Sequence, residues 1–139
     1  MINAGIPGET TDEGLKRLPE VLDEHSPDLV IILEGGNDLL RRKAHANIRS
    51  NLEQMVAIAR QRGSQVLLLA VPELKLAASP PDLYEEIASA SGIPLMKDIV
   101  TDLEFDRQYK SDPIHLNTEG YRRLAEAVHQ RLYDCGSIP

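Results

Sequence analysis

Residues 28–38 read DLVIILEGGND, and this stretch decides the fold. Behind one aspartate runs an unbroken series of β-branched and aliphatic side chains, which predicts a strand at residues 28–33 that is buried on both faces. The two glycines that follow let the backbone turn sharply and would place Asn37 at the top of a sheet. Such a strand is typical of a parallel sheet that helices cover on both sides.

The segments on either side of this stretch alternate between extended and helical patterns. Further strands are predicted at residues 2–6, 65–71 and 93–96. Helices are predicted from Thr10, with Glu13 completing a capping box, over residues 47–62 and 80–90, and from Asn117 onward. This alternation predicts a single α/β domain over residues 1–139, with functional residues beyond the carboxyl ends of the strands.

Two of the predicted helices carry an apolar stripe that should face a core. The stripe of the helix at residues 47–62 consists of Ile48, Leu52, Met55, Val56 and Ala59. The stripe of the last helix consists of Tyr121, Leu124, Ala125, Val128 and Leu132.

The composition is that of a small acidic protein. Hydrophobic residues make up 42% of the 139 residues, and the formal net charge is −7. An acidic surface repels phosphate backbones, so we expect no nucleic-acid partner. The longest apolar runs are far too short to cross a bilayer, so no transmembrane segment is predicted.

The cysteine content and the N-terminus bear on the compartment. Cys135 is the only cysteine, which rules out an intramolecular disulfide. No signal peptide follows Met1, so the sequence as given indicates a cytoplasmic protein. An export signal in a missing N-terminal piece would make it periplasmic or secreted. No motif requires a cofactor or a metal.

A first candidate site is the loop at residues 3–11, between a predicted strand and a predicted helix. Gly8 stands at its bend, where glycine permits the backbone N–H to approach an anion closely. A tight turn between strand and helix explains the same residues and is the better interpretation of this loop taken alone.

A second candidate is Asn37, in the glycine-rich loop after the strand at residues 28–33. An asparagine amide in such a position can stabilise an oxyanion, a role worth roughly 2.7–4 kcal/mol in other enzymes. The alternative is an Asx turn in a glycine-rich loop.

A third candidate lies at residues 111–117, immediately before the last predicted helix. Asp112 stands three residues ahead of His115 and can accept its Nδ1–H, which leaves Nε2 free to act as a general base. A surface Asp–His pair beside a helix cap is one alternative. A metal site is another, although no second histidine or carboxylate stands at ligand spacing.

Taken in order, these three loops resemble the sequence blocks of the SGNH (GDSL-type) hydrolase superfamily, in the branch of small esterases and thioesterase I/lysophospholipase-like enzymes. Gly8 in AGIPGETT matches the glycine block, Asn37 in GGND the asparagine block, and Asp112 with His115 the closing Asp-x-x-His block. The segment GLKRLP at residues 14–19 is also typical of this branch. The resemblance covers essentially the whole chain.

The resemblance implies a three-layer α/β/α fold with a parallel sheet, as in flavodoxin. It also implies hydrolysis of a small acyl ester or thioester. By resemblance, the Gly8 N–H and the Asn37 side chain would be oxyanion donors, His115 the general base, and Asp112 its orienting carboxylate. The loops at residues 39–42 and 73–81 would border the acyl pocket by position alone.

The serine nucleophile of that family is missing from this sequence. The family's Gly-Asp-Ser block precedes the glycine block, and no Gly-Asp-Ser or Gly-x-Ser-x-Gly occurs here. None of the eight serines stands at the expected place, and Cys135 lies beyond the last predicted helix. These serines are Ser26, Ser50, Ser64, Ser79, Ser89, Ser91, Ser111 and Ser137.

The missing block predicts a fold without its first strand, which the resemblance places between the strands at residues 2–6 and 28–33. We therefore expect an N-terminally truncated SGNH hydrolase domain that is inactive alone and self-associates through exposed strand edges. Two alternatives remain open. One is a non-catalytic module that uses the same loops to hold a ligand, and the other is one subunit of a heteromeric esterase whose partner supplies the serine.

Overall fold

The computed structural model describes residues 1–74 and 78–139, which divide into two compact units. The first unit comprises residues 1–97 and the second residues 98–139. Each unit has its own internal packing. The single domain that the sequence suggests stays a prediction.

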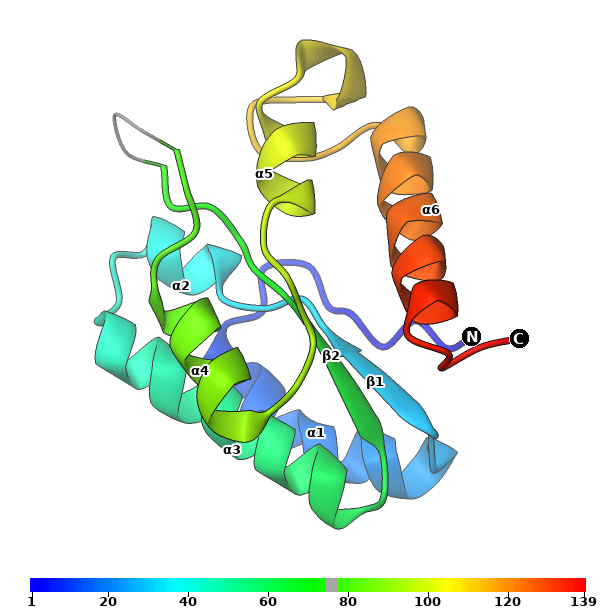
Figure 1. The fold of residues 1–139 in the computed structure, drawn as a ribbon. Coiled ribbons are helices and arrows are strands. Elements are labelled where there is room, and N and C mark those ends of the chain that lie inside the picture. The colour runs from blue at the N-terminus through cyan, green and yellow to red at the C-terminus, as the bar shows by residue number, and fades with distance from the viewer. Residues whose placement is uncertain (75–77) are drawn as a thin grey trace. The chain divides into compact units, whose positions relative to one another are not determined.

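The first unit is a parallel sheet with helices (Figure 1). Its elements in chain order are α1 Thr11–His25, β1 Leu29–Ile32, α2 Gly36–Leu40, α3 His45–Gln61, β2 Gln65–Leu69, α4 Leu83–Ser91 and β3 Leu95–Met96. The strand order is β1–β2–β3, with Leu29 opposite Gln65 and Leu68 opposite Leu95. Both strand pairs are parallel, which confirms the predicted α/β class.

Helices α1, α3 and α4 form a layer along one side of this sheet (Figure 1). Helix α3 packs against α1, α4 and β2, and its predicted apolar stripe from Ile48 to Ala59 is buried throughout. The opposing side chains from the sheet are Ile32, Val66 and Leu68. Burial of aliphatic side chains therefore holds the layer on the sheet.

Helix α1 begins where the sequence predicts. The Thr10 N–H donates to Glu13 Oε2 over 2.9 Å and the Thr10 side chain faces the Glu13 backbone N–H, so the capping box forms. The helix then runs without a break through Pro19. Thr10, Thr11 and Gly14 are buried whereas Asp12 and Glu13 are exposed, so one side of the first turn packs on the unit and fixes the loop that carries Gly8.

Two predictions about the strands are wrong. Residues 2–6 form no strand with any part of the chain that the structure describes, because an extended segment needs a neighbour to take its backbone hydrogen bonds. Strand β1 is not buried on both faces, since Ile31 is 38% exposed and Leu33, just beyond the strand, is 42% exposed. Both residues lie at the β1 edge of the sheet, which has a strand neighbour on one side within the described residues.

The second unit is helical. It contains α5 Ile99–Glu104, the short 3₁₀ helix η1 Arg107–Tyr109 and α6 Thr118–Asp134. Asn117 caps α6 as predicted, because its Oδ1 accepts from the Gly120 N–H over 2.9 Å. Gly120 is needed there, since a Cβ would lie 2.6 Å from the Tyr109 carbonyl oxygen.

The apolar stripe of α6 is less buried than its pattern predicts. Leu124 is buried, Val128 and Leu132 are half-buried, and Tyr121 and Ala125 are exposed. Within its unit α6 contacts α5 and η1, which are too short to cover a helix of 17 residues. Across residues 1–74 and 78–139, no helix is both long and apolar enough to span a bilayer.

Candidate active site

Gly8 lies in a tight turn that exposes its backbone N–H. The Glu9 N–H donates to the Ile6 carbonyl over 3.2 Å, and Gly8 has a φ of 78°. Proline followed by glycine with positive φ is typical of a type II turn. The Gly8 N–H has no acceptor among the described residues, and the space above its Cα is open. The turn therefore leaves one backbone donor available to an anion.

Asn37 lies in the first turn of α2, after two glycines, the first of which the packing requires. Gly35 has a φ of 110°, and a Cβ there would lie 2.4 Å from the hydroxyl of Tyr84. That hydroxyl donates to the Glu34 carbonyl over 2.7 Å. The Asn37 Nδ2 in turn donates to the Glu9 carbonyl over 2.8 Å and has a second hydrogen left.

Two further contacts join the loop of Gly8 to the loop of Asn37. Asp38 is 1% exposed, and its carboxylate accepts from the Thr11 N–H over 2.8 Å and from the Thr11 hydroxyl over 2.7 Å. The Arg41 guanidinium donates to the Gly8 carbonyl over 3.3 Å. The first unit therefore brings Gly8 and Asn37, far apart in the sequence, onto adjoining loops.

Buried acidic groups surround these loops. Glu9 is 6% exposed and forms an ion pair with Arg17, whose Nη2 lies 2.7 Å from Glu9 Oε2. Burial, together with the charges of Glu9 and Asp38, raises the pKa of Glu34 to about 7. Sequence reasoning missed Glu9, Arg17 and Glu34 as parts of the site. The signal for Arg17 was its place in the GLKRLP segment.

Asp112 and His115 meet within the second unit. Asp112 Oδ2 lies 2.8 Å from His115 Nδ1, and Asp112 Oδ1 accepts from the backbone N–H groups of Ile114 and His115. These bonds, the two backbone donors foremost, lower the pKa of Asp112 to about 2. The carboxylate is therefore ionised at neutral pH and can hold the Nδ1–H tautomer, while the His115 side chain, 63% exposed, presents Nε2 outward.

Ser111 does not direct its hydroxyl at the His115 imidazole. The Ser111 Oγ donates instead to the backbone carbonyls of His115 and Leu116, over 3.3 Å and 3.2 Å. A hydroxyl held by two carbonyls is not placed to give its proton to an imidazole. Cys135 is exposed at the C-terminal end of α6.

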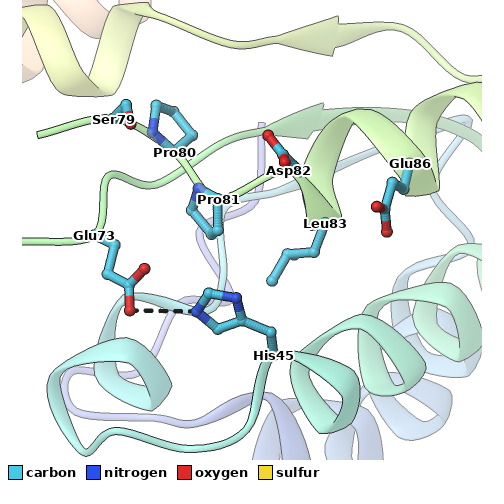
Figure 2. Close-up of a pocket in the computed structure, with 8 residues that line it drawn as sticks. All are labelled: His45, Glu73, Ser79, Pro80, Pro81, Asp82, Leu83 and Glu86. Atoms are coloured by element: carbon cyan, nitrogen blue, oxygen red, sulfur yellow. Dashed lines mark hydrogen bonds and ion pairs between the residues drawn. The ribbon is translucent and has the colours of Figure 1, made fainter.

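A polar hollow of about 450 Å³ lies in the first unit, between the start of α3 and the segment before α4 (Figure 2). His45 Nε2 lies 3.2 Å from Glu73 Oε1, and Asp82 and Glu86 add two more carboxylates. Of the predicted pocket loops, residues 73 and 79–81 line this hollow, whereas residues 75–77 lie outside the described part of the chain. Its carboxylates are costly to desolvate, so the hollow suits a polar group better than a long alkyl chain.

The described residues thus hold two sets of chemical groups, each within its own unit. Residues 1–97 contain two N–H donors, at Gly8 and Asn37, suited to a developing negative charge. Residues 98–139 contain a carboxylate–imidazole pair suited to proton transfer. Over residues 1–74 and 78–139, no group of three or more His, Cys, Asp or Glu side chains could hold a metal ion.

Known proteins resemble this chain in sequence. Residues 1–123 match the GDSL-like Lipase/Acylhydrolase family. An arylesterase of Vibrio mimicus is 34% identical over 141 aligned positions, which cover 95% of this chain and 69% of the relative. The thioesterase 1/protease 1/lysophospholipase L1 of Escherichia coli is 28% identical, over 95% of this chain and 66% of the relative. The chain therefore spans about two thirds of the length of these relatives.

The fold also resembles solved structures. The crystal structure of TesA superposes with a TM-score of 0.82 and 32% sequence identity, over 94% of this chain and 76% of that one. The family match and both relatives concern esterases or acyl hydrolases, and the TesA structure shares the fold. The chain belongs to the GDSL-like lipase/acylhydrolase family of SGNH hydrolases, which are carboxylic ester hydrolases.

Proposed function

We propose that this protein takes part in serine-dependent hydrolysis of small acyl esters or thioesters. The observation that carries the proposal is the pairing of Gly8 and Asn37 on adjoining loops, with hydrogens left free on the Gly8 N–H and the Asn37 amide. An acyl-transfer oxyanion needs two or more such donors fixed in advance. The Asp112–His115 pair supplies the complementary proton-transfer group.

In this reaction a serine hydroxyl attacks the acyl carbonyl while His115 Nε2 takes its proton. The negative charge that develops on the carbonyl oxygen is stabilised by the Gly8 N–H and the Asn37 amide. His115 then gives the proton to the departing alcohol or thiol, and water releases the acyl group by the same steps. Asp112 accepts the Nδ1–H throughout and stabilises the imidazolium.

We propose that the serine comes from polypeptide outside these 139 residues. None of the eight serines stands in a nucleophile motif, and the Ser111 hydroxyl is held by backbone carbonyls. The serine would be supplied by a segment joined to this chain or by a second chain. The 139 residues alone are then expected to be inactive.

The test compares p-nitrophenyl acetate and butyrate hydrolysis by this chain and by a version extended at its N-terminus with a Gly-Asp-Ser strand. The extended form should hydrolyse both esters, and His115→Ala should abolish the activity. His129→Ala, which removes an exposed histidine from α6 of the same unit, is the matched control and should retain it. Turnover by the short chain would disprove the external serine, whereas an inactive extended form would favour a module that holds ligands without hydrolysis.

A further inference from the structure

Arg17 forms hydrogen bonds at two points of the chain around the turn that carries Gly8. Its Nε lies 2.9 Å from Glu9 Oε1 and its Nη2 lies 2.7 Å from Glu9 Oε2, so the carboxylate is held by two parallel bonds. The same Nη2 donates to the Ala4 carbonyl over 2.7 Å. One guanidinium on α1 therefore holds Ala4, before the Ile6–Glu9 turn, and Glu9, the last residue of the turn.

Glu9 connects the Arg17 contacts to the second oxyanion donor, Asn37. Its backbone carbonyl accepts the Asn37 Nδ2 hydrogen over 2.8 Å, and its N–H closes the turn of Gly8 by donating to Ile6. A shift of Glu9 would move the Gly8 N–H directly. It would also remove the acceptor that orients the Asn37 amide. The positions of both donors thus depend on one residue.

The position of Glu9 in turn depends on the charge of Arg17. The Glu9 side chain is buried beside two other acidic residues, Glu34 and Asp38. A buried carboxylate that loses its cationic partner is driven toward water or toward protonation. Arg17 supplies that partner, and its planar fork matches a carboxylate in a way that the single ammonium of lysine does not.

We propose that Arg17 and Glu9 are positioning residues that hold both oxyanion donors, Gly8 and Asn37, in place; this inference rests on the proposed function. Neither side chain touches the substrate. Arg17 acts through Glu9, and Glu9 acts through the closure of its turn and its bond to Asn37. A change at Arg17 should therefore weaken transition-state stabilisation while leaving substrate binding nearly unchanged.

The first experiment uses the 139-residue chain itself and needs no catalysis. NMR spectra of ¹⁵N-labelled protein would follow the Gly8 backbone amide and the Asn37 side-chain amide in Arg17→Met and Arg17→Lys. Arg62→Met is the matched control, because Arg62 also pairs with an acidic residue, Asp23 of α1, at a solvent-exposed site. Both resonances should shift in Arg17→Met and shift less in Arg17→Lys. Neither should shift in Arg62→Met.

The second experiment measures ester hydrolysis in the chain extended with the Gly-Asp-Ser strand. Arg17→Met should lower kcat roughly 10- to 100-fold, the cost of misplacing catalytic donors by about 1 Å. The KM should change less than about threefold, and Arg17→Lys should restore part of kcat.

Resonances of Gly8 and Asn37 that do not move in Arg17→Met would overturn the proposal, as would an equal loss of kcat in Arg62→Met. Should Arg17→Met fail to fold, the resonances and the kcat of Arg17→Lys test the proposal in its place. An extended wild-type chain that hydrolyses nothing would contradict the proposed function alone. The resonances of the 139-residue chain would then still decide whether Arg17 positions Gly8 and Asn37.

Discussion

The loops of Gly8 and Asn37 are joined by contacts between residues distant in sequence, whereas Asp112 and His115 are joined within a single loop. Asn37 reaches Glu9 across 28 positions, and Asp38 reaches Thr11 across 27. Asp112 and His115 are three positions apart, and both are exposed. The first region therefore depends on the folding of its whole unit, while the second needs little more than its own backbone.

The largest expected effect compares two aspartates that both accept backbone and side-chain hydrogen bonds, Asp38 at a buried site and Asp112 at an exposed one. Asp38→Ala should lower the free energy of unfolding by about 2–4 kcal/mol, because the buried Thr11 N–H and hydroxyl lose their acceptor. Asp112→Ala should have a much smaller effect, because the N–H groups that it releases can bind water. Urea denaturation followed by circular dichroism measures both, and equal losses would disprove the contrast.

The same contrast explains what the sequence could predict. Three features involve only residues that are close together in the sequence. They are the apolar stripe of α3, the Asn117 cap and the contact between Asp112 and His115. Periodicity and capping patterns report such local geometry directly. The sequence alone therefore predicts these features.

The contacts that the sequence did not reveal are those that only the tertiary fold creates. Nothing in the spacing of Arg17 and Glu9 indicates that a guanidinium closes around a turn. Residues 2–6 show a strand pattern, yet whether a strand forms depends on a neighbour with free backbone groups. The apolar stripe of α6 likewise indicates which face of the helix could be buried. It does not indicate whether another element covers that face.

A second effect, of intermediate size, should appear as a pH dependence of the free energy of unfolding, and it arises in the first region. Burial, with the charges of Glu9 and Asp38, raises the pKa of Glu34 from 4.5 to about 7. Between these values the folded state holds a proton that the unfolded state has lost, so stability should fall as the pH rises from about 4.5 to about 7. The loss should reach at most about 3 kcal/mol.

Urea denaturation across this pH range, compared with Glu34→Gln, isolates the contribution of Glu34. The amide cannot ionise, so the variant should lose this fall in stability and should be the more stable form at pH 8. A wild-type stability that rises steadily from pH 4.5 to 7, with no difference in Glu34→Gln, would show that Glu34 ionises as easily when folded as when unfolded.

The smallest expected effect lies in the second region and concerns which bonds keep Asp112 ionised. Its pKa is lowered from 3.8 to about 2, first by the N–H groups of Ile114 and His115 and then by the His115 side chain. His115→Ala removes only the side-chain contribution, so the Asp112 midpoint should rise but remain below 3.8. A ¹³C NMR titration of the Asp112 carboxyl group measures this. A midpoint that returns fully to 3.8 would mean that the imidazole, and not the backbone, holds the carboxylate, and the second region would then be less self-contained than its geometry indicates.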